Sequence, residues 1–150
     1  MNYKYTSRSV EDTLRVAENI ESEKFPNMVI CLEGDLGCGK TVFTKGFASA
    51  LGIEETITSP TFTIIKEYMN GELPLYHMDV YRMESTEEDI GVEDYYNKGG
   101  ITIIEWADLI ESRLPSERLV IKFKVIDEDT RVLVFEPYGE QYEELCNAVL

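Results

Sequence analysis

The eight residues 34–41 constrain the fold of this chain more than any other segment. They read Gly-Asp-Leu-Gly-Cys-Gly-Lys-Thr and match the phosphate-binding pattern G-x-x-x-x-G-K-[ST] at every fixed position. The continuous apolar run at 28–32 precedes them, which is typical of a strand covered on both faces. A helical pattern over 40–51 follows, with Phe43 and Phe47 on its apolar stripe. Because strand, glycine-rich turn and helix are the context that the pattern requires, the sequence predicts a P-loop.

The residue types of this loop suit a polyphosphate. Glycines let the backbone curl so that successive N–H groups point inward, and the following helix adds its positive end. Lys40 places an ammonium on the β and γ phosphates of ATP, and the hydroxyl of Thr41 is a ligand for Mg²⁺. We therefore assign nucleotide binding to eight consecutive residues: Asp35, Leu36, Gly37, Cys38, Gly39, Lys40, Thr41 and Val42.

Cys38 lies inside the predicted loop, next to Lys40 and a helix N-terminus. Both neighbours act to lower a thiol pKa, which would permit a redox switch. The sequence favours the other interpretation, a small side chain tolerated where bulk would crowd the backbone. With three cysteines in all, an odd number, and no pair at metal-ligand spacing, the sequence favours neither a disulfide framework nor a zinc site.

The remaining pattern predicts a single α/β domain over 1–150. We expect a P-loop NTPase fold whose mainly parallel sheet is flanked by helices and has antiparallel strands at one side. Ser9 and Asp12 have capping-box spacing and mark the first helix, whereas the acidic segment 84–96 suggests helix in pieces. Further strands are predicted at 56–58, 62–68, 75–80 and 101–104, and as a hairpin at 120–126 and 131–135.

The net charge of −15 bears on partners. Nucleic acids are polyanions, and the 14 Lys and Arg are scattered, so direct, tight binding of a nucleic acid is disfavoured. The acid excess serves solubility or meets a basic protein partner, and composition does not choose between these. No apolar run reaches the roughly 18–20 residues of a membrane span, and the N-terminus lacks a signal-peptide pattern. We expect a cytoplasmic protein, monomeric when isolated, with no membrane contact.

Several polar residues outside the loop are candidates for the same site. Asp79 ends a predicted strand and is the best carboxylate for orienting Mg²⁺, with a capping aspartate as the alternative. Glu105 follows another strand and suits a water-positioning acid or a third metal ligand, and Trp106 suits stacking on a base. From the residues alone, a structural role is slightly favoured for each of these two. Thr61 lies in a hydroxyl-rich loop that either reaches the γ-phosphate or merely enters a strand. His77, the sole histidine, is interpreted as packing or as support for the site rather than as a base.

Together these motifs resemble the TsaE (YjeE) family, the ATPase component of the bacterial machinery for threonylcarbamoyladenosine in tRNA. Their order and spacing match over roughly residues 9 to 125. Cys38 and Val42 depart from the family's usual alanine and threonine without removing a phosphate or metal contact. The motifs are Gly-Asp-Leu-Gly-Cys-Gly-Lys-Thr at 34–41, Ser-Pro-Thr-Phe-Thr at 59–63, His-Met-Asp-Val-Tyr-Arg at 77–82, Gly-Val-Glu-Asp-Tyr at 91–95 and Ile-Glu-Trp at 104–106.

The resemblance implies roles that residue chemistry alone leaves open. It implies a magnesium-binding Asp79, a switch-type Thr61 near the γ-phosphate, a catalytic or water-positioning Glu105 and a nucleotide-proximal Trp106. Lys40 then also belongs to the catalytic set. The implied cofactors are ATP and Mg²⁺. The implied partners are the proteins TsaD and TsaB, with tRNA met only through the complex and ATP hydrolysis weak without it.

Two other functions remain alternatives. A small-molecule or nucleoside kinase of the P-loop class would carry a lid with arginines, and here Arg113 and Arg118 flank only a short turn. A nucleotide-dependent switch that reads guanine would carry Asn-Lys-x-Asp, whereas residues 97–100 read Asn-Lys-Gly-Gly. The missing aspartate favours ATP over GTP.

Overall fold

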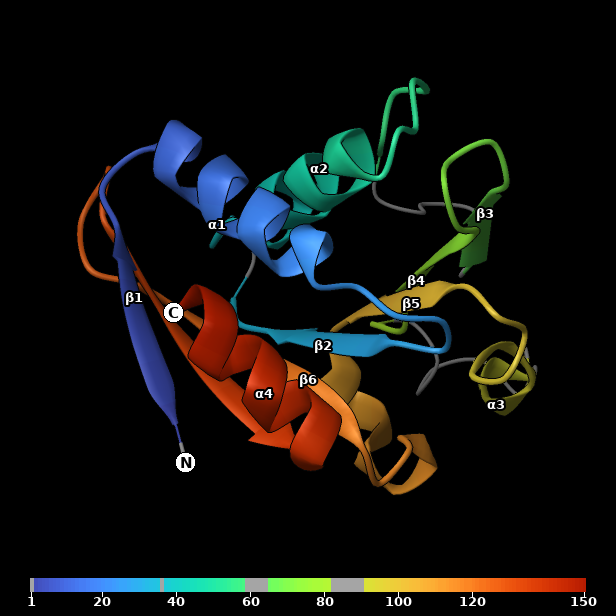
Figure 1. Ribbon diagram of the computed structural model, residues 1–150. Coiled ribbons are helices and arrows are strands. Elements are labelled where there is room, and N and C mark those ends of the chain that lie inside the picture. The colour runs from blue at the N-terminus through green and yellow to red at the C-terminus, as the bar shows by residue number, and fades with distance from the viewer. Residues whose placement is uncertain (1, 36, 59–64, 82–90) are drawn as a thin grey trace.

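The computed structural model describes residues 2–35, 37–58, 65–81 and 91–150, which build a seven-stranded sheet with helices on both faces (Figure 1). The strands lie in the order β1-β7-β6-β2-β5-β4-β3. Their bounds are β1 Tyr3–Ser7, β2 Val29–Glu33, β3 Ile65–Tyr68, β4 Leu75–Asp79, β5 Ile101–Glu105, β6 Arg118–Val125 and β7 Arg131–Tyr138. The helices are α1 Val10–Ser22, α2 Lys40–Ala50, α3 Val92–Tyr95, α4 Glu140–Val149 and the 3₁₀ helix η2 Ala107–Arg113.

The sheet is parallel at its centre and antiparallel at its edges. β2 pairs in parallel with β5 and β6, and β5 pairs in parallel with β4. β6, β7 and β1 then continue as antiparallel neighbours. The α/β fold with a parallel centre and flanking helices is confirmed, and the structure adds an antiparallel strand, β3, at the opposite edge.

Alternate side chains of the central strands enter two separate cores. Ile30 and Leu32 of β2 pack toward α1, α2 and α4, whereas Val29 and Cys31 pack toward α3 and η2. Figure 1 shows α1 and α2 side by side above the sheet. Because β2 and β5 are covered on both faces, their carboxyl ends are fixed in position, and these are the ends from which the candidate site is built.

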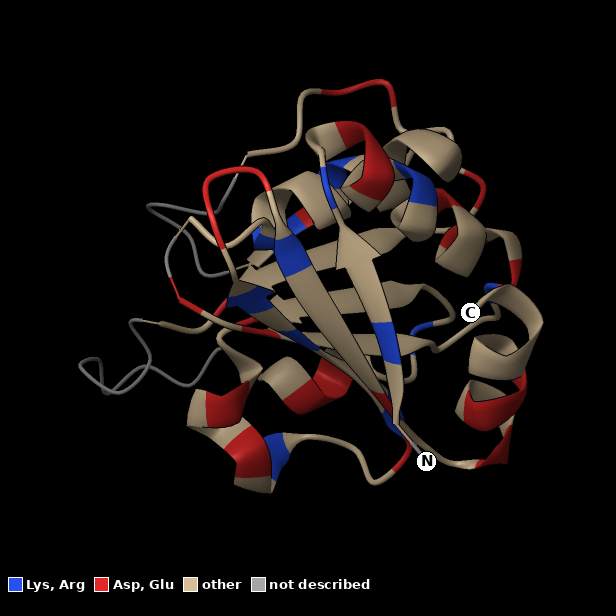
Figure 2. Ribbon diagram, turned by 90° about the vertical axis from the view of Figure 1, so that its left-hand side faces the viewer, with Lys and Arg blue, Asp and Glu red and all other residues tan. Residues whose placement is uncertain are grey.

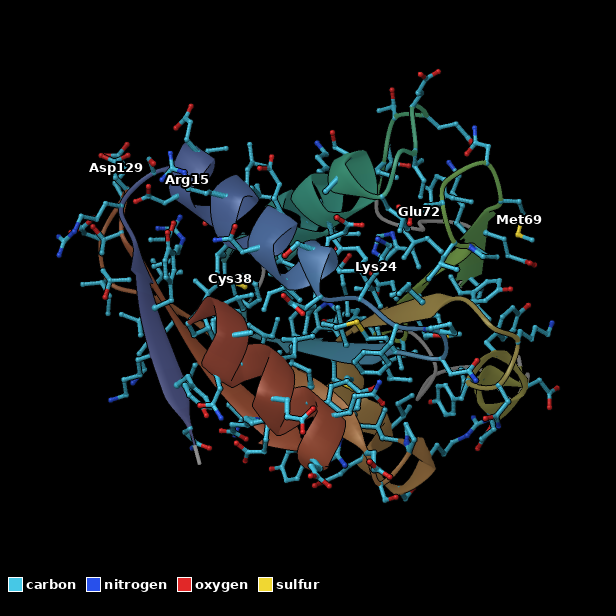
Figure 3. The ribbon with its side chains drawn as sticks, in the orientation of Figure 1. Arg15, Lys24, Cys38, Met69, Glu72 and Asp129 are labelled. Carbon is cyan, nitrogen blue, oxygen red and sulfur yellow. The ribbon has the colours of Figure 1, made fainter. Side chains whose placement is uncertain are left out.

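Local signals account for the ends of the first two helices. The Ser9 hydroxyl accepts a hydrogen bond from the backbone N–H of Asp12 at 3.1 Å, as its capping-box spacing predicts. Lys24, just after α1, contacts Glu21 at 2.8 Å and Glu72 at 3.2 Å, so it ties the end of α1 to the turn before β4 (Figure 3). Gly52, directly after α2, adopts a φ of +92°, the conformation that ends many helices.

Some predicted elements differ from the observed ones. The edge strand β1 was not predicted, and no strand forms at 56–58. Of the strand predicted at 62–68, residues 65–68 form β3, and 62–64 lie outside the described residues. In the segment 84–96, only α3 is described as helix, since 84–90 also lie outside. The hairpin of β6 and β7 is confirmed.

Acidic residues are spread over the helices and loops that surround the sheet, with fewer basic residues between them (Figure 2). Among the described residues, no helix is both long and apolar enough to cross a membrane.

Candidate nucleotide-binding site

The predicted P-loop leaves the carboxyl end of β2 and runs directly into α2. Gly34, Gly37 and Gly39 have φ values of +146°, +77° and +109°, which L side chains rarely adopt. A Cβ on Gly34 would lie 2.8 Å from the sulfur of Cys38 and 2.9 Å from the carbonyl oxygen of Phe123. The loop therefore curls as the glycine pattern predicts, and Gly34 is fixed both by conformation and by space.

Lys40 is the first residue of α2 and is only 5% exposed. Its Nζ donates a hydrogen bond to the carbonyl of Gly34 at 2.5 Å and lies 3.5 Å from the centre of the Trp106 ring. Among the described residues, no carboxylate forms an ion pair with this ammonium, although the chain carries 29 acidic side chains. A buried cation without an anion is costly. The site is thus prepared for an anionic ligand.

Two carboxylates lie at neighbouring strand ends beside the loop. Asp79 of β4 and Glu105 of β5 are paired in the parallel register, and β5 lies between β4 and the P-loop strand. Asp79 is partly exposed, and its Oδ1 accepts a hydrogen bond from the N–H of Tyr81 at 3.0 Å. Glu105 is 3% exposed and contacts His77. The structure therefore brings together the two acids that the sequence selected separately.

Burial is the main influence on the Asp79 carboxyl. It raises the pKa of Asp79 above its ordinary value, and the nearby charge of Glu105 raises it further. The hydrogen bond from Tyr81 and the charge of Lys40 oppose this rise in pKa. A carboxylate that is costly to ionise without a counter-charge is suited to a cation.

The donor set fits a magnesium ion that takes most of its ligands from elsewhere. No group of three or more His, Cys, Asp or Glu side chains converges within the described ranges. Thr41, Asp79 and Glu105 would supply few oxygens, and Mg²⁺ typically keeps several waters and binds phosphate for the rest. The arrangement suits a metal ion that binds together with a nucleotide, rather than one whose ligands all come from the protein.

Trp106 follows β5 at once and has a φ of +62°, in the left-handed region. Its ring packs on that of Tyr81, with centroids 4.8 Å apart, and against the Lys40 ammonium. Trp106 therefore lies beside the P-loop lysine, and its stacking on a base stays a prediction. The Tyr81 contact was not predicted, because only the fold brings 81 and 106 together.

A pocket of about 270 Å³ opens beside the start of the loop. Burial and the nearby charge of Asp108 raise the pKa of Glu33 there. Carboxylates disfavour phosphate at this place, whereas the aromatic rings suit an uncharged, planar group. Sequence reasoning did not select the lining residues from η2 and β6, since nothing local marks them. The lining includes Glu33, Asp35, Trp106, Asp108, Lys122 and Phe123.

The remaining selected residues separate into three groups. Gly37 and Asp35 are exposed on the loop, and Val42 is partly buried in the first turn of α2. Leu36 and Thr61 lie outside the described residues.

At Cys38 the structure agrees with the favoured interpretation, a small packed side chain, and not with a lowered thiol pKa. Cys38 is 1% exposed and belongs to the larger core, and Figure 3 shows it inside the outline of the molecule. Burial raises its pKa and outweighs the opposite effect of Lys40. A buried, protonated thiol reacts slowly, so the structure favours the small, packed side chain over the redox switch.

Comparison with known proteins decides the family. The family model "Threonylcarbamoyl adenosine biosynthesis protein TsaE" matches residues 7–133. The chain belongs to the TsaE family. The match contains the P-loop, both strand-end carboxylates and Trp106, so the candidate site lies within the part that defines the family.

Individual relatives agree with this assignment. A TsaE protein of Bacillus subtilis, named for tRNA threonylcarbamoyladenosine biosynthesis, is 51% identical over 143 residues, which are 95% of this chain and 90% of that protein. The TsaE protein of Treponema pallidum is 42% identical over 83% of this chain and 93% of its own length. The crystal structure of Bacillus subtilis YdiB superposes with a TM-score of 0.84 at 44% identity, over 99% of this chain and 94% of that one.

Proposed function

We propose that this TsaE-family chain binds ATP with Mg²⁺ and hydrolyses it as one component of tRNA threonylcarbamoyladenosine biosynthesis. It acts with the proteins TsaD and TsaB and meets tRNA only through them. The proposal that the chain binds ATP rests on the environment of Lys40. Its ammonium is buried beside a curled glycine loop and has no carboxylate partner among the described residues. A polyphosphate is the anion that this loop and helix terminus suit best.

Each polar group has a role in this proposal. Lys40 moves its ammonium from the Gly34 carbonyl to the β and γ phosphates. Thr41 and Asp79 hold the metal, and Glu105 orients the water that attacks. Mg²⁺ supplies charge neutralisation on the phosphates when it is bound. Thr61 completes the γ-phosphate side by the family resemblance.

The partner proposal rests on the relatives' names and on charge. Relatives that match most of this chain are named for tRNA threonylcarbamoyladenosine biosynthesis. The net charge of −15 disfavours direct binding of a polyanion such as tRNA. Basic faces of protein partners are therefore the better complement for this surface.

The kinase alternative has little support from the described arginines. Arg113 forms two hydrogen bonds to the carboxylate of Glu93, at 2.6 and 2.8 Å, and Arg118 donates to the carbonyl of Pro115. Both guanidinium groups already bind protein oxygens near η2. Neither forms a lid over the P-loop.

The guanine-reading alternative is disfavoured by position. Gly99 donates to the side-chain oxygen of Asn27 at 2.7 Å, just before β2 begins, so the Asn97–Gly100 segment lies at the amino end of the parallel strands. The P-loop lies at their carboxyl end. A guanine-reading motif would need to reach the nucleotide, and this segment is at the wrong end of the sheet.

Calorimetric titration with ATP and GTP, with and without Mg²⁺, tests the binding. We expect ATP to bind more tightly, with a contribution from Mg²⁺ that Thr41→Val removes. Thr44→Val is the matched control, since the buried Thr44 hydroxyl donates to the Lys40 carbonyl within α2 at 3.0 Å. Equal Mg²⁺ dependence in both variants would contradict the assigned metal site.

Phosphate release, measured alone and with TsaB and TsaD, tests the activity. We expect slow release from the isolated chain and faster release in the complex. Transfer of phosphate to an acceptor other than water would favour the kinase instead. The same rate with and without the partners would remove the partner-dependent part of the proposal.

A further inference from the structure

His77 and Glu105 form a buried polar pair directly behind the candidate site. His77 lies within β4 and is 0% exposed, and Glu105 ends β5 at 3% exposure. The ring Nε2 of His77 lies 2.5 Å from Oε2 of Glu105. A pair this close, between adjacent strands and away from water, holds both side chains in one arrangement.

The surroundings of the ring indicate which nitrogen carries the proton. An ionised Glu105 carboxylate can only accept, so the nitrogen that faces it must donate. The other nitrogen, Nδ1, has no hydrogen-bond partner among the described residues. A proton there would be a buried donor without an acceptor, which native structures rarely contain. The arrangement therefore selects the tautomer with hydrogen on Nε2 and a bare Nδ1.

We propose that His77 is a positioning residue for Glu105, whose carboxylate it locks through the Nε2–H hydrogen bond so that the second oxygen is held for the attacking water. This inference rests on the proposed function, because it takes Glu105 as the acid that orients the water. A glutamate has three rotatable bonds, and each one left free would loosen the geometry of the site. His77 removes that freedom from a side chain that stands at a strand end.

The sheet explains why this support is rigid. Asp79 and Glu105 are register partners, and His77 lies two residues before Asp79 on the same face of β4. Within the described part of the chain, the side-chain contact of the ring is the one that Nε2 makes with Glu105. This contact is the one through which His77 orients the acid.

Two substitutions of similar size separate positioning from simple packing. His77→Gln keeps a side-chain N–H that can reach the carboxylate, and His77→Met removes it. We expect both variants to bind ATP within about threefold of the wild-type affinity. His77→Met should lose about 10- to 100-fold in the rate of phosphate release at saturating ATP, measured in the complex with TsaB and TsaD, and His77→Gln should recover most of it.

A double-mutant cycle with Glu105→Gln tests whether His77 acts through Glu105. If it does, His77→Met has little further effect once Glu105 is changed, because the two losses are not additive. The matched control is Tyr68→Phe, which removes another buried polar atom without a described partner and should leave the rate unchanged. Equal rates in the Met and Gln variants, or fully additive losses in the cycle, would overturn the inference.

Nitrogen NMR gives a readout that needs no activity and no variant. His77 is the only histidine, so the ring nitrogens of labelled protein give one unambiguous set of signals. We expect the Nε2–H tautomer in the wild type and a tautomer mixture in Glu105→Ala. An Nδ1–H tautomer in the wild type sinks the inference even if His77→Met does not fold. If the wild-type complex releases no phosphate, both the proposed function and this role of His77 are wrong. If the complex is active but His77 has the Nδ1–H tautomer, only the role of His77 is wrong.

Discussion

The two halves of the sheet differ in the charged and polar side chains that they bury. In the parallel half, β2, β5 and β4 carry or adjoin the buried Lys40, His77 and Glu105. In the antiparallel half, β6, β7 and β1 bury apolar side chains such as Leu133 and Phe135. In this half Lys122 and Glu136 form an ion pair at 3.1 Å, in which Lys122 is about half exposed and Glu136 is 16% exposed.

This difference separates residues that hold the fold from residues that do chemistry. Apolar burial stabilises a protein directly, so the antiparallel half needs no further explanation. A buried ammonium or carboxylate costs free energy unless a partner compensates it. The polar groups of the parallel half therefore indicate function, and substitutions in the two halves should affect different measurements.

Leu133→Ala should produce the largest loss of stability with no matching loss of function. Leu133 of β7 is fully buried in the larger core, and such truncations cost about 2–5 kcal/mol. Unfolding in denaturant should show this loss, while calorimetry should show ATP affinity within about twofold of the wild type. Val125→Ala is the control, since Val125 is 49% exposed and should change stability by less than about 0.5 kcal/mol. A loss of ATP affinity in Leu133→Ala would break the division between the halves.

Lys40→Ala should have the opposite effect, a large loss of activity with little loss of stability. Removing the one ammonium at the loop should slow phosphate release about 10²- to 10³-fold, the usual effect of losing a key electrostatic contact. Stability should change little, because the lost contacts are one carbonyl and one ring face. Lys45→Ala removes the same charge from the exposed face of α2 and should leave release unchanged. If both variants lose activity equally, the effect belongs to net charge and not to the site.

Sequence predicted the P-loop well because its causes are local. The glycines, the apolar run before them and the helix after them all lie within about 20 residues, and the observed loop and helix agree with them. The Asp79 and Glu105 candidates were also found locally, as acids that end strands. Their pairing was not predicted, since it depends on β4 and β5 being neighbours.

Long-range contacts decided the features that the sequence left open or did not predict. Cys38 has a helix terminus and Lys40 beside it, yet burial among residues far along the chain raises its pKa. The contact between His77 and Glu105 joins residues 28 positions apart, so no local pattern marks it. The short edge strand β1 pairs with β7, more than 100 residues later, and its own sequence is a weak signal.

Gly34→Ala and Gly52→Ala should separate a functional glycine from a conformational one. Both positions have positive φ, but a Cβ on Gly34 meets Cys38 and Phe123, whereas a Cβ on Gly52 meets nothing within 4 Å. We expect Gly52→Ala to cost about 1 kcal/mol of stability without changing ATP affinity. Gly34→Ala should in addition weaken ATP binding about tenfold or more, since the loop must shift. Calorimetry on both variants measures the difference, and equal affinities would mean that the loop tolerates the shift.

Alkaline pH should produce the smallest effect, and the same one in both halves. Burial raises the thiol pKa of Cys31 in β2 and of Cys146 in α4, each from an ordinary value of 9.0 to about 12. Between these values the unfolded chain loses the proton and the folded chain keeps it, so stability falls as pH rises above 9. Each thiol should remove about 1 kcal/mol between pH 9 and 10. Cys31→Ala and Cys146→Ala should therefore flatten the dependence of unfolding free energy on pH by equal amounts. A flatter curve in only one variant would mean that the two halves also differ in how they bury a neutral group.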